Sequence, residues 1–268
     1  MIWWDYASIF LVLMLGVPHG GLDAAVARRV GCPNTSRAWL LFHAAYILLS
    51  LLVVCLWWFF PLLSLSAFLL ISAVHFGFSD ITDYGSHWFP ALVHGGLVSI
   101  AIPVLQSDSV EPIFSVLVGS SNANILLIVI ENIFYLWTVL LLFYLFFALK
   151  QRTYRKPLII LMVMLFFAYS LPPLVTFAIY FCLSHSRGHL FRQWQRLPEK
   201  ERSRAFKEIL FYSLASWTIA AGAFFFLDES MFVDILRLTF IGLAALTVPH
   251  MLLVDYADRQ LLRLENEK

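Results

Sequence analysis

Residues 124–149 read NILLIVIENIFYLWTVLLLFYLFFAL, a stretch in which Glu131 is the only charged side chain. A helix needs about 20 mainly apolar residues to cross a bilayer, so this stretch predicts a membrane-spanning helix. Residues 38–61 and 232–254 meet the same requirement. The whole chain has this character, because 61% of its 268 residues are hydrophobic and 13% are charged, where a soluble domain carries about 25% charged residues. We therefore expect one integral membrane domain over residues 1–268.

Proline, glycine and charged residues divide the chain into nine expected spans, with eight as the alternative count. The predicted fold is an all-α, polytopic transmembrane helical bundle whose spans cover residues 2–17, 38–59, 62–79, 88–106, 124–149, 157–170, 172–190, 207–227 and 232–254. Basic clusters follow the first, fifth and seventh spans, whereas acidic residues follow the fourth (Asp108, Glu111) and the eighth (Asp228, Glu229). Positive charge marks cytoplasmic loops. We therefore predict a multi-pass protein of the inner cell membrane with an external N-terminus and a cytoplasmic C-terminus.

Histidines collect near the cytoplasmic ends of these spans. Ionisable side chains inside a membrane are costly, so each is a candidate for function. His185 and His189 form H-S-R-G-H, the spacing by which one helix face presents two imidazoles to a metal; an interfacial capping pair is the alternative. With His19 and His75 expected at the same depth, these four predict a metal site, and His250 is a further candidate. Imidazole ligands suit iron, copper or zinc.

Aspartates follow three of these histidines at nearly helical spacing. The motifs are P-H-G-G-L-D with Asp23, H-F-G-F-S-D with Asp80, and P-H-M-L-L-V-D with Asp255. A metal-bound imidazole usually donates its other N–H to a carboxylate or carbonyl, which fixes its tautomer. We expect Asp23 and Asp80 to orient histidines, either their own or those of another helix. Pro18 and Pro249 precede histidines and predict locally broken helices at the site.

The remaining histidines carry weaker signals. His43 and His94 are each isolated near an expected helix end, where a hydrogen-bonded or interfacial role is commoner than metal binding. His87 stands beside Trp88 and is expected at the surface. The net charge of +1 gives no indication of nucleic-acid binding.

The motifs P-H-G-G-L-D, V-H-F-G-F-S-D, Y-F-C-L-S-H-S-R-G-H and T-V-P-H-M-L-L-V-D resemble, in the same order, those of the bacterial and archaeal Brp/Blh family of β-carotene 15,15′-dioxygenases. The resemblance covers residues 15 to 256. It implies that O₂ and non-haem Fe(2+) cleave β-carotene at its central double bond, and that the two retinals formed serve a microbial rhodopsin. The family's proposed ligands match His19, His75, His185 and His189, and His250 matches a further motif histidine.

The same motifs carry aromatic residues, and we take Phe76, Tyr180 and Phe181 as candidate substrate contacts. The fourth span reads A-L-V-H-G-G-L, where the family pattern has an arginine before the glycine, so His94 is left without an assigned role.

Three other functions compete with carotenoid cleavage. A membrane hydroxylase or desaturase of the histidine-box type needs several such boxes, and this chain has one. A haem protein would use axial histidine pairs. A carotenoid or retinal carrier would need no metal. An opsin needs a buried lysine for its Schiff base, and no lysine lies in the interior of an expected span: Lys150, Lys156, Lys200 and Lys268 are outside the spans, and Lys207 is the first residue of the eighth.

Overall fold

The computed structural model describes residues 3–32, 35–85 and 87–266, with side chains as far as residue 257. Within these ranges every regular element is helical, which confirms the all-α expectation. The elements are α1 (Trp3–Leu11), η1 (Val12–Gly16), η2 (Val17–Leu22), α2 (Asp23–Arg29), α3 (Ser36–Phe59), α4 (Pro61–Ile81), α5 (Trp88–Gly96), η3 (Leu97–Ala101), α6 (Ile102–Leu105), α7 (Ser107–Val118), α8 (Ser120–Lys150), η4 (Arg152–Tyr154), α9 (Arg155–Ser170), α10 (Pro173–Ile179), η5 (Tyr180–Ser186), α11 (Arg187–Gln195), α12 (Glu199–Phe224) and α13 (Met231–Asn266).

Seven helical segments among the described residues are long and apolar enough to cross a membrane. They are Trp3–Arg29, Ser36–Phe59, Pro61–Ile81, Trp88–Leu105, Ser120–Lys150, Arg152–Ser170 and Met231–Ala257. The Ser36–Phe59 segment is apolar all round and exposes Leu40, Leu48 and Leu51, as a helix facing lipid does. These segments make the chain a membrane protein.

Two expected spans lie outside these seven. Residues 172–190 and 207–227 are largely helical, in α10 to α11 and in α12. Both segments include polar and charged residues, and neither is among the seven. The count of nine spans therefore stays a prediction.

Three local expectations were wrong. The first helix does not end at residue 17 but continues to Arg29, because the π turn of η1 and the 3₁₀ turn of η2 absorb Gly16 and Pro18 without ending it. Pro249 does not break α13. A membrane helix tolerates the loss of the one backbone hydrogen bond that an internal proline removes. The acidic segment after the fourth span is not a loop but the helix α7. The break expected at Pro18 is confirmed as a change of helix type.

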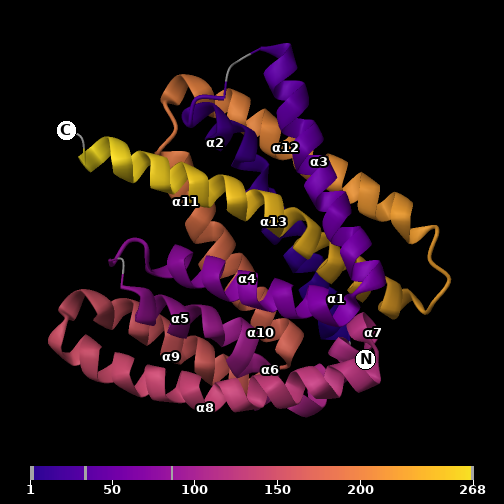
Figure 1. Ribbon diagram of the computed structural model, residues 1–268, viewed down its shortest axis with the longest axis vertical. Coiled ribbons are helices and arrows are strands. Elements are labelled where there is room, and N and C mark those ends of the chain that lie inside the picture. The colour runs from indigo at the N-terminus through magenta and orange to yellow at the C-terminus, as the bar shows by residue number, and fades with distance from the viewer. Residues whose placement is uncertain (1–2, 33–34, 86, 267–268) are drawn as a thin grey trace. The chain divides into compact units, whose positions relative to one another are not determined.

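The chain forms two compact units. The first unit comprises residues 1–12 and 60–188, and the second comprises 13–59 and 189–268. In the first unit α4, α5 and α8 run side by side (Figure 1). Glycines allow this close packing, since a Cβ on Gly77 would lie 2.0 Å from the carbonyl oxygen of Ala91, and one on Gly95 would lie 1.7 Å from that of Ala73.

In the second unit α13 packs along α3 and α2, and α12 packs on η2 (Figure 1). The approach of α12 depends on Gly21, because a Cβ there would lie 2.8 Å from the Cα of Ile209. A small core of Leu22, Ala25, Leu197 and Ala205 lies beside this contact. The packing fixes η2, which carries His19, against α12.

Candidate functional site

Each unit contains its own group of buried histidines. In the first unit, His75 of α4 and His185 of η5 form a pair, which we call the histidine pair. In the second unit, His19 of η2, His189 of α11 and His250 of α13 form the histidine trio. The metal-site candidates are therefore divided between the two units, and each group is described separately.

The histidine pair is enclosed by aromatic side chains. The ring centroids of His75 and His185 are 5.1 Å apart, and the side chains are 5% and 1% exposed. Phe76 packs on His185 with its centroid at 4.4 Å, and Phe181 stacks on the same ring at 5.9 Å. Water is thus excluded from most of this imidazole.

Asp80 connects the pair to a tyrosine. One carboxylate oxygen of Asp80 lies 3.5 Å from Nδ1 of His185, and the other accepts a hydrogen bond of 2.6 Å from the hydroxyl of Tyr180. Asp80 therefore faces the histidine of another helix, not His75 of its own helix. Tyr180, expected as a substrate contact, directs its hydroxyl to this carboxylate.

The histidine trio is equally compact. Its ring centroids lie 5.1 Å apart for His19 and His250, 5.1 Å for His189 and His250, and 5.8 Å for His19 and His189. His189 and His250 are each 3% exposed, and His19 is partly buried. The three imidazoles come from sequence positions as distant as 19 and 250, yet each ring lies beside the other two.

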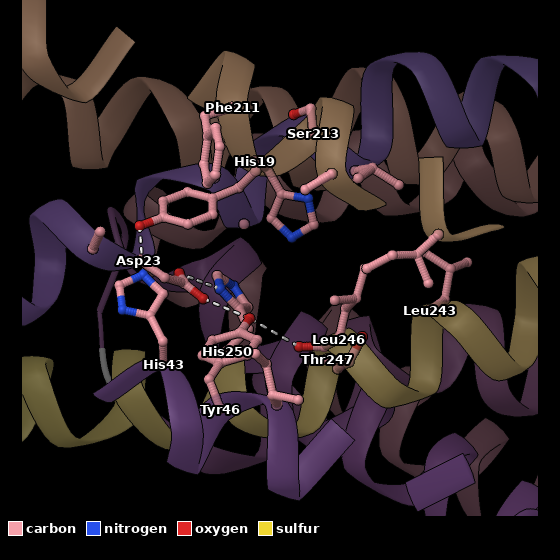
Figure 2. A pocket seen from close by; sticks show the side chains of 18 of the residues that line it. His19, Asp23, His43, Tyr46, Phe211, Ser213, Leu243, Leu246, Thr247 and His250 are labelled. Atoms are coloured by element: carbon pink, nitrogen blue, oxygen red, sulfur yellow. Dashed lines mark hydrogen bonds and ion pairs between the residues drawn. The ribbon is translucent and has the colours of Figure 1, made fainter. Parts of the chain in front are cut away.

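Asp23 plays the same part in the trio that Asp80 plays in the pair. Its Oδ1 lies 2.7 Å from Nδ1 of His250, and its Oδ2 accepts a hydrogen bond of 2.8 Å from the hydroxyl of Tyr46 (Figure 2). Asp23 is 5% exposed. Here too the aspartate contacts a histidine of another helix, and Asp255 is not the carboxylate on this nitrogen. Each unit thus contains a tyrosine–aspartate–histidine chain.

These contacts set the tautomers of two imidazoles. Nδ1 of His250 donates to Asp23, and Nδ1 of His19 donates to the carbonyl oxygen of Gly16. In a neutral imidazole one nitrogen is the donor and the other carries the lone pair. In the neutral form of both rings Nε2 therefore carries the lone pair, and this is the form that binds metals.

The donor set of the two groups suits a metal that prefers imidazole. Buried rings, carboxylate and carbonyl partners on Nδ1, and aromatic surroundings are features of protein metal sites. Across the described part of the chain, however, no three histidine, cysteine or acidic side chains are gathered closely enough to hold an ion. The chemistry of the donors fits iron, while a complete coordination shell is not formed.

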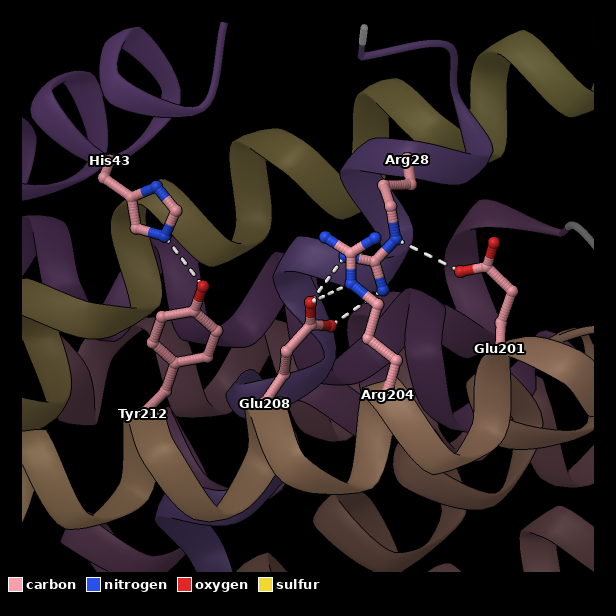
Figure 3. Close-up of polar contacts among 6 residues, drawn as sticks. All are labelled: Arg28, His43, Glu201, Arg204, Glu208 and Tyr212. Carbon is pink, nitrogen blue, oxygen red and sulfur yellow. Dashed lines mark hydrogen bonds and ion pairs between the residues drawn. The ribbon is translucent and has the colours of Figure 1, made fainter. Parts of the chain in front are cut away.

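Two of the other histidines, His43 and His94, are held by hydrogen bonds. Nδ1 of His43 donates to the carbonyl oxygen of Trp39 at 2.7 Å, and its Nε2 accepts from the hydroxyl of Tyr212 at 2.7 Å (Figure 3). Both ring nitrogens of His43 are thus used. His94 lies 3.3 Å from the hydroxyl of Tyr144, and His87 is exposed among aromatic rings.

A cavity of about 270 Å³ adjoins the histidine trio (Figure 2). His19, Asp23 and His250 line one part of it, together with His43 and Tyr46. The rest of the wall is mainly apolar and includes Phe42, Ile47, Phe211, Ala215, Ile219, Leu243 and Leu246. The expected substrate contacts Phe76, Tyr180 and Phe181 surround the histidine pair and do not line this cavity.

Sequence reasoning missed Tyr46, Tyr212 and the ionic cluster beside them. Arg28 donates to Glu208 at 2.6 and 2.8 Å and to Glu201 at 3.1 Å (Figure 3). Its guanidinium also lies 5.6 Å from the centroid of Trp39. An arginine near the end of a span is ordinarily interpreted as a topology signal, so the sequence offered no sign of these partners.

Comparison with known proteins identifies the family. A family model described as Beta-carotene 15,15'-dioxygenase matches residues 10–258. A relative named Beta-carotene 15,15'-dioxygenase, from uncultured marine bacterium 66A03, is 35% identical over 261 residues, which cover 95% of this chain and 94% of the relative. No solved structure is significantly similar. With its buried histidine groups and membrane-spanning helices, this chain belongs to the β-carotene 15,15′-dioxygenase family.

Proposed function

We propose that this protein cleaves β-carotene at its central 15,15′ double bond with O₂ and releases two molecules of all-trans-retinal. In this reaction the central C=C bond breaks and each of its carbons receives one oxygen atom, so both atoms of O₂ are used. The observation that carries the proposal is family membership over nearly the whole chain. The buried histidine groups and their aromatic surroundings support it.

We further propose that the reaction depends on Fe(2+), with His75 and His185 of the pair and His19 and His189 of the trio as imidazole ligands, and His250 as a further candidate. Bound iron would supply a Lewis-acidic, redox-active centre for the reaction of O₂ with the polyene. One support is that all the proposed ligand atoms are imidazole nitrogens. The other is that Nδ1 of His19 faces the carbonyl oxygen of Gly16 and Nδ1 of His250 faces the carboxylate of Asp23, which leaves Nε2 of each ring on the opposite side as the metal-binding nitrogen.

Residues beside the histidine pair and the histidine trio hold the proposed ligands in place. Asp23 and Asp80 hold imidazoles in one orientation and increase their basicity, because each carboxylate stays close to an Nδ1 nitrogen. Tyr46 and Tyr180 each donate to one of these carboxylates and so fix its rotamer. Phe76 and Phe181 exclude water, which protects an apolar substrate and an oxidising centre from side reactions.

The membrane arrangement is a separate part of the proposal. We propose a location in the inner cell membrane with the N-terminus outside and the C-terminus in the cytoplasm, supported by the basic clusters after the first, fifth and seventh expected spans. β-Carotene would then reach the protein from the bilayer. Delivery of retinal to a microbial rhodopsin stays a prediction of the family resemblance.

The test is expression in a host that makes β-carotene. Cells with the wild-type chain should lose β-carotene and gain retinal as the sole cleavage product, and ¹⁸O₂ should label both retinals. Purified protein should contain iron without a haem absorbance band. A product hydroxylated or desaturated without chain cleavage would favour the histidine-box oxygenase instead, and carotenoid binding without turnover or metal would favour a carrier.

A further inference from the structure

We infer that the cavity beside the histidine trio holds one ring end of the carotenoid while the polyene extends toward His19. The inference rests on the proposed carotenoid cleavage and adds a place for the substrate. Its boundary is defined within the second unit by η2, α2, α3, α12 and α13, whose residues supply every lining side chain.

The size of the cavity argues for one end of the substrate. Its volume is about 270 Å³, slightly below the roughly 300–1,000 Å³ typical of pockets for drug-sized ligands. β-Carotene has two bulky trimethylcyclohexenyl rings joined by a long polyene and is larger than such ligands. The cavity can therefore enclose a ring with a short length of chain, and the remainder of the molecule must lie elsewhere.

The lining has the chemistry of a hydrocarbon ring site. Aliphatic and aromatic side chains from α3, α12 and α13 form most of the wall. Several of the polar groups that line it are already paired: Tyr46 and His250 with Asp23, and His43 with Tyr212. These groups can stay hydrogen-bonded when an apolar ring displaces water, so the penalty for burying unpaired polar atoms is small.

The mouth of the cavity suits a ligand dissolved in lipid. Three lining residues are also exposed: Ile47 of α3 by 58%, and Phe211 and Ile219 of α12 by 66% and 73%. A ring that enters past these side chains stays in contact with apolar surface. His43 and Tyr212 also line the cavity, and their hydrogen bond joins α3 to α12 (Figure 3).

The experiment measures binding of β-ionone, a single ring with a short side chain, to purified protein in detergent by calorimetry. Pseudoionone, its open-chain isomer, serves as the ligand control. Ala215→Phe and Ile47→Trp fill the cavity from two helices. Leu214→Phe and Leu48→Trp are matched controls, because these exposed residues neighbour the first two in sequence but do not line the cavity.

Both filling substitutions should weaken β-ionone binding at least about tenfold, since the added atoms occupy the space of the ring and overpacking is costly. Both controls should bind as the wild type does. Pseudoionone should bind the wild type about tenfold more weakly, because its rotatable bonds must be immobilised. Wild-type affinity for β-ionone in both filled variants would overturn the inference.

A second measurement needs no variant. Hydrogen exchange of the wild-type protein should show that β-ionone protects peptides of α3 and α12, and not those of α8. Protection confined to α8 or other helices of the first unit would overturn the inference even if the filled variants fail to fold. Neither assay requires iron, oxygen or turnover. If the protein forms retinal but β-ionone does not bind in the cavity, the inference is refuted and the proposed function is not. If β-ionone binds in the cavity but no retinal forms, the proposed function is refuted.

Discussion

Replacing Asp23 by Asn should leave the fold intact and much of the iron bound, but retinal formation per bound iron should fall about 10–100-fold. Asp23 is 5% exposed and accepts from Nδ1 of His250 at 2.7 Å and from the hydroxyl of Tyr46 at 2.8 Å. Hydrogen bonds to a charged partner contribute about 1.5–3 kcal/mol each. An asparagine has one carbonyl oxygen and no charge, so it cannot accept from both donors with two separate oxygens as the carboxylate does. A neutral amide costs less to bury than a carboxylate, and this gain offsets part of the lost hydrogen-bond energy. We therefore expect the free energy of unfolding to fall by about 1–3 kcal/mol.

The assay compares retinal formed per bound iron in wild-type and Asp23→Asn protein, with thermal unfolding in detergent alongside. Asp108→Asn is the control, because Asp108 is exposed in the first turn of α7. Tyr46→Phe tests whether the tyrosine acts through Asp23: its effect should largely disappear in the Asp23→Asn background, as it does for coupled residues. Wild-type turnover per iron in Asp23→Asn would refute the reasoning and leave the imidazole to be held by packing alone.

Two further substitutions test the packing. Gly95→Ala should reduce the free energy of unfolding by about 1–3 kcal/mol or more, because its Cβ would lie 1.7 Å from the carbonyl oxygen of Ala73; thermal unfolding checks this. Gly222→Ala, with nothing within 4 Å, should instead be neutral or stabilising by up to about 1 kcal/mol, and an equal loss in both would contradict the packing argument. Arg28→Ala should reduce the free energy of unfolding by about 1–3 kcal/mol, since Glu208 loses this guanidinium but keeps Arg204 at 3.0 Å; an unchanged unfolding temperature would show that the ion pair is not stabilising.

Much of the fold could be predicted because hydrophobicity alone marks a membrane helix. Residues 124–149 needed no other information, and α8 contains all of them. The exact helix ends were less predictable, since Pro18 and Pro249 are the same residue type with different outcomes. Backbone packing decides whether a proline changes the helix type or is accommodated. The helix α7 was missed because its charges and Pro112 resemble those of a loop.

The histidines that gather in the two groups could be picked out from the sequence, but their hydrogen-bond partners could not, and their binding of a metal stays a prediction. His19, His75, His185 and His189 are identifiable from their motifs, but the sequence left open whether each aspartate contacts its own histidine or one of another helix. Asp23 contacts His250, 227 positions away, because α2 and α13 pack together. Tyr46 belongs to none of the motifs, so only the tertiary structure reveals its hydrogen bond to Asp23.

The central claim is that carotenoid cleavage depends on iron held by histidine. The most direct measurement determines bound iron per chain and retinal yield together for His185→Ala, His189→Ala and His43→Ala. We predict that the first two lose most of their iron and nearly all retinal formation, while His43→Ala, whose two ring nitrogens already have protein partners, keeps its iron. Full iron occupancy with wild-type retinal yield in His185→Ala and His189→Ala would contradict the account.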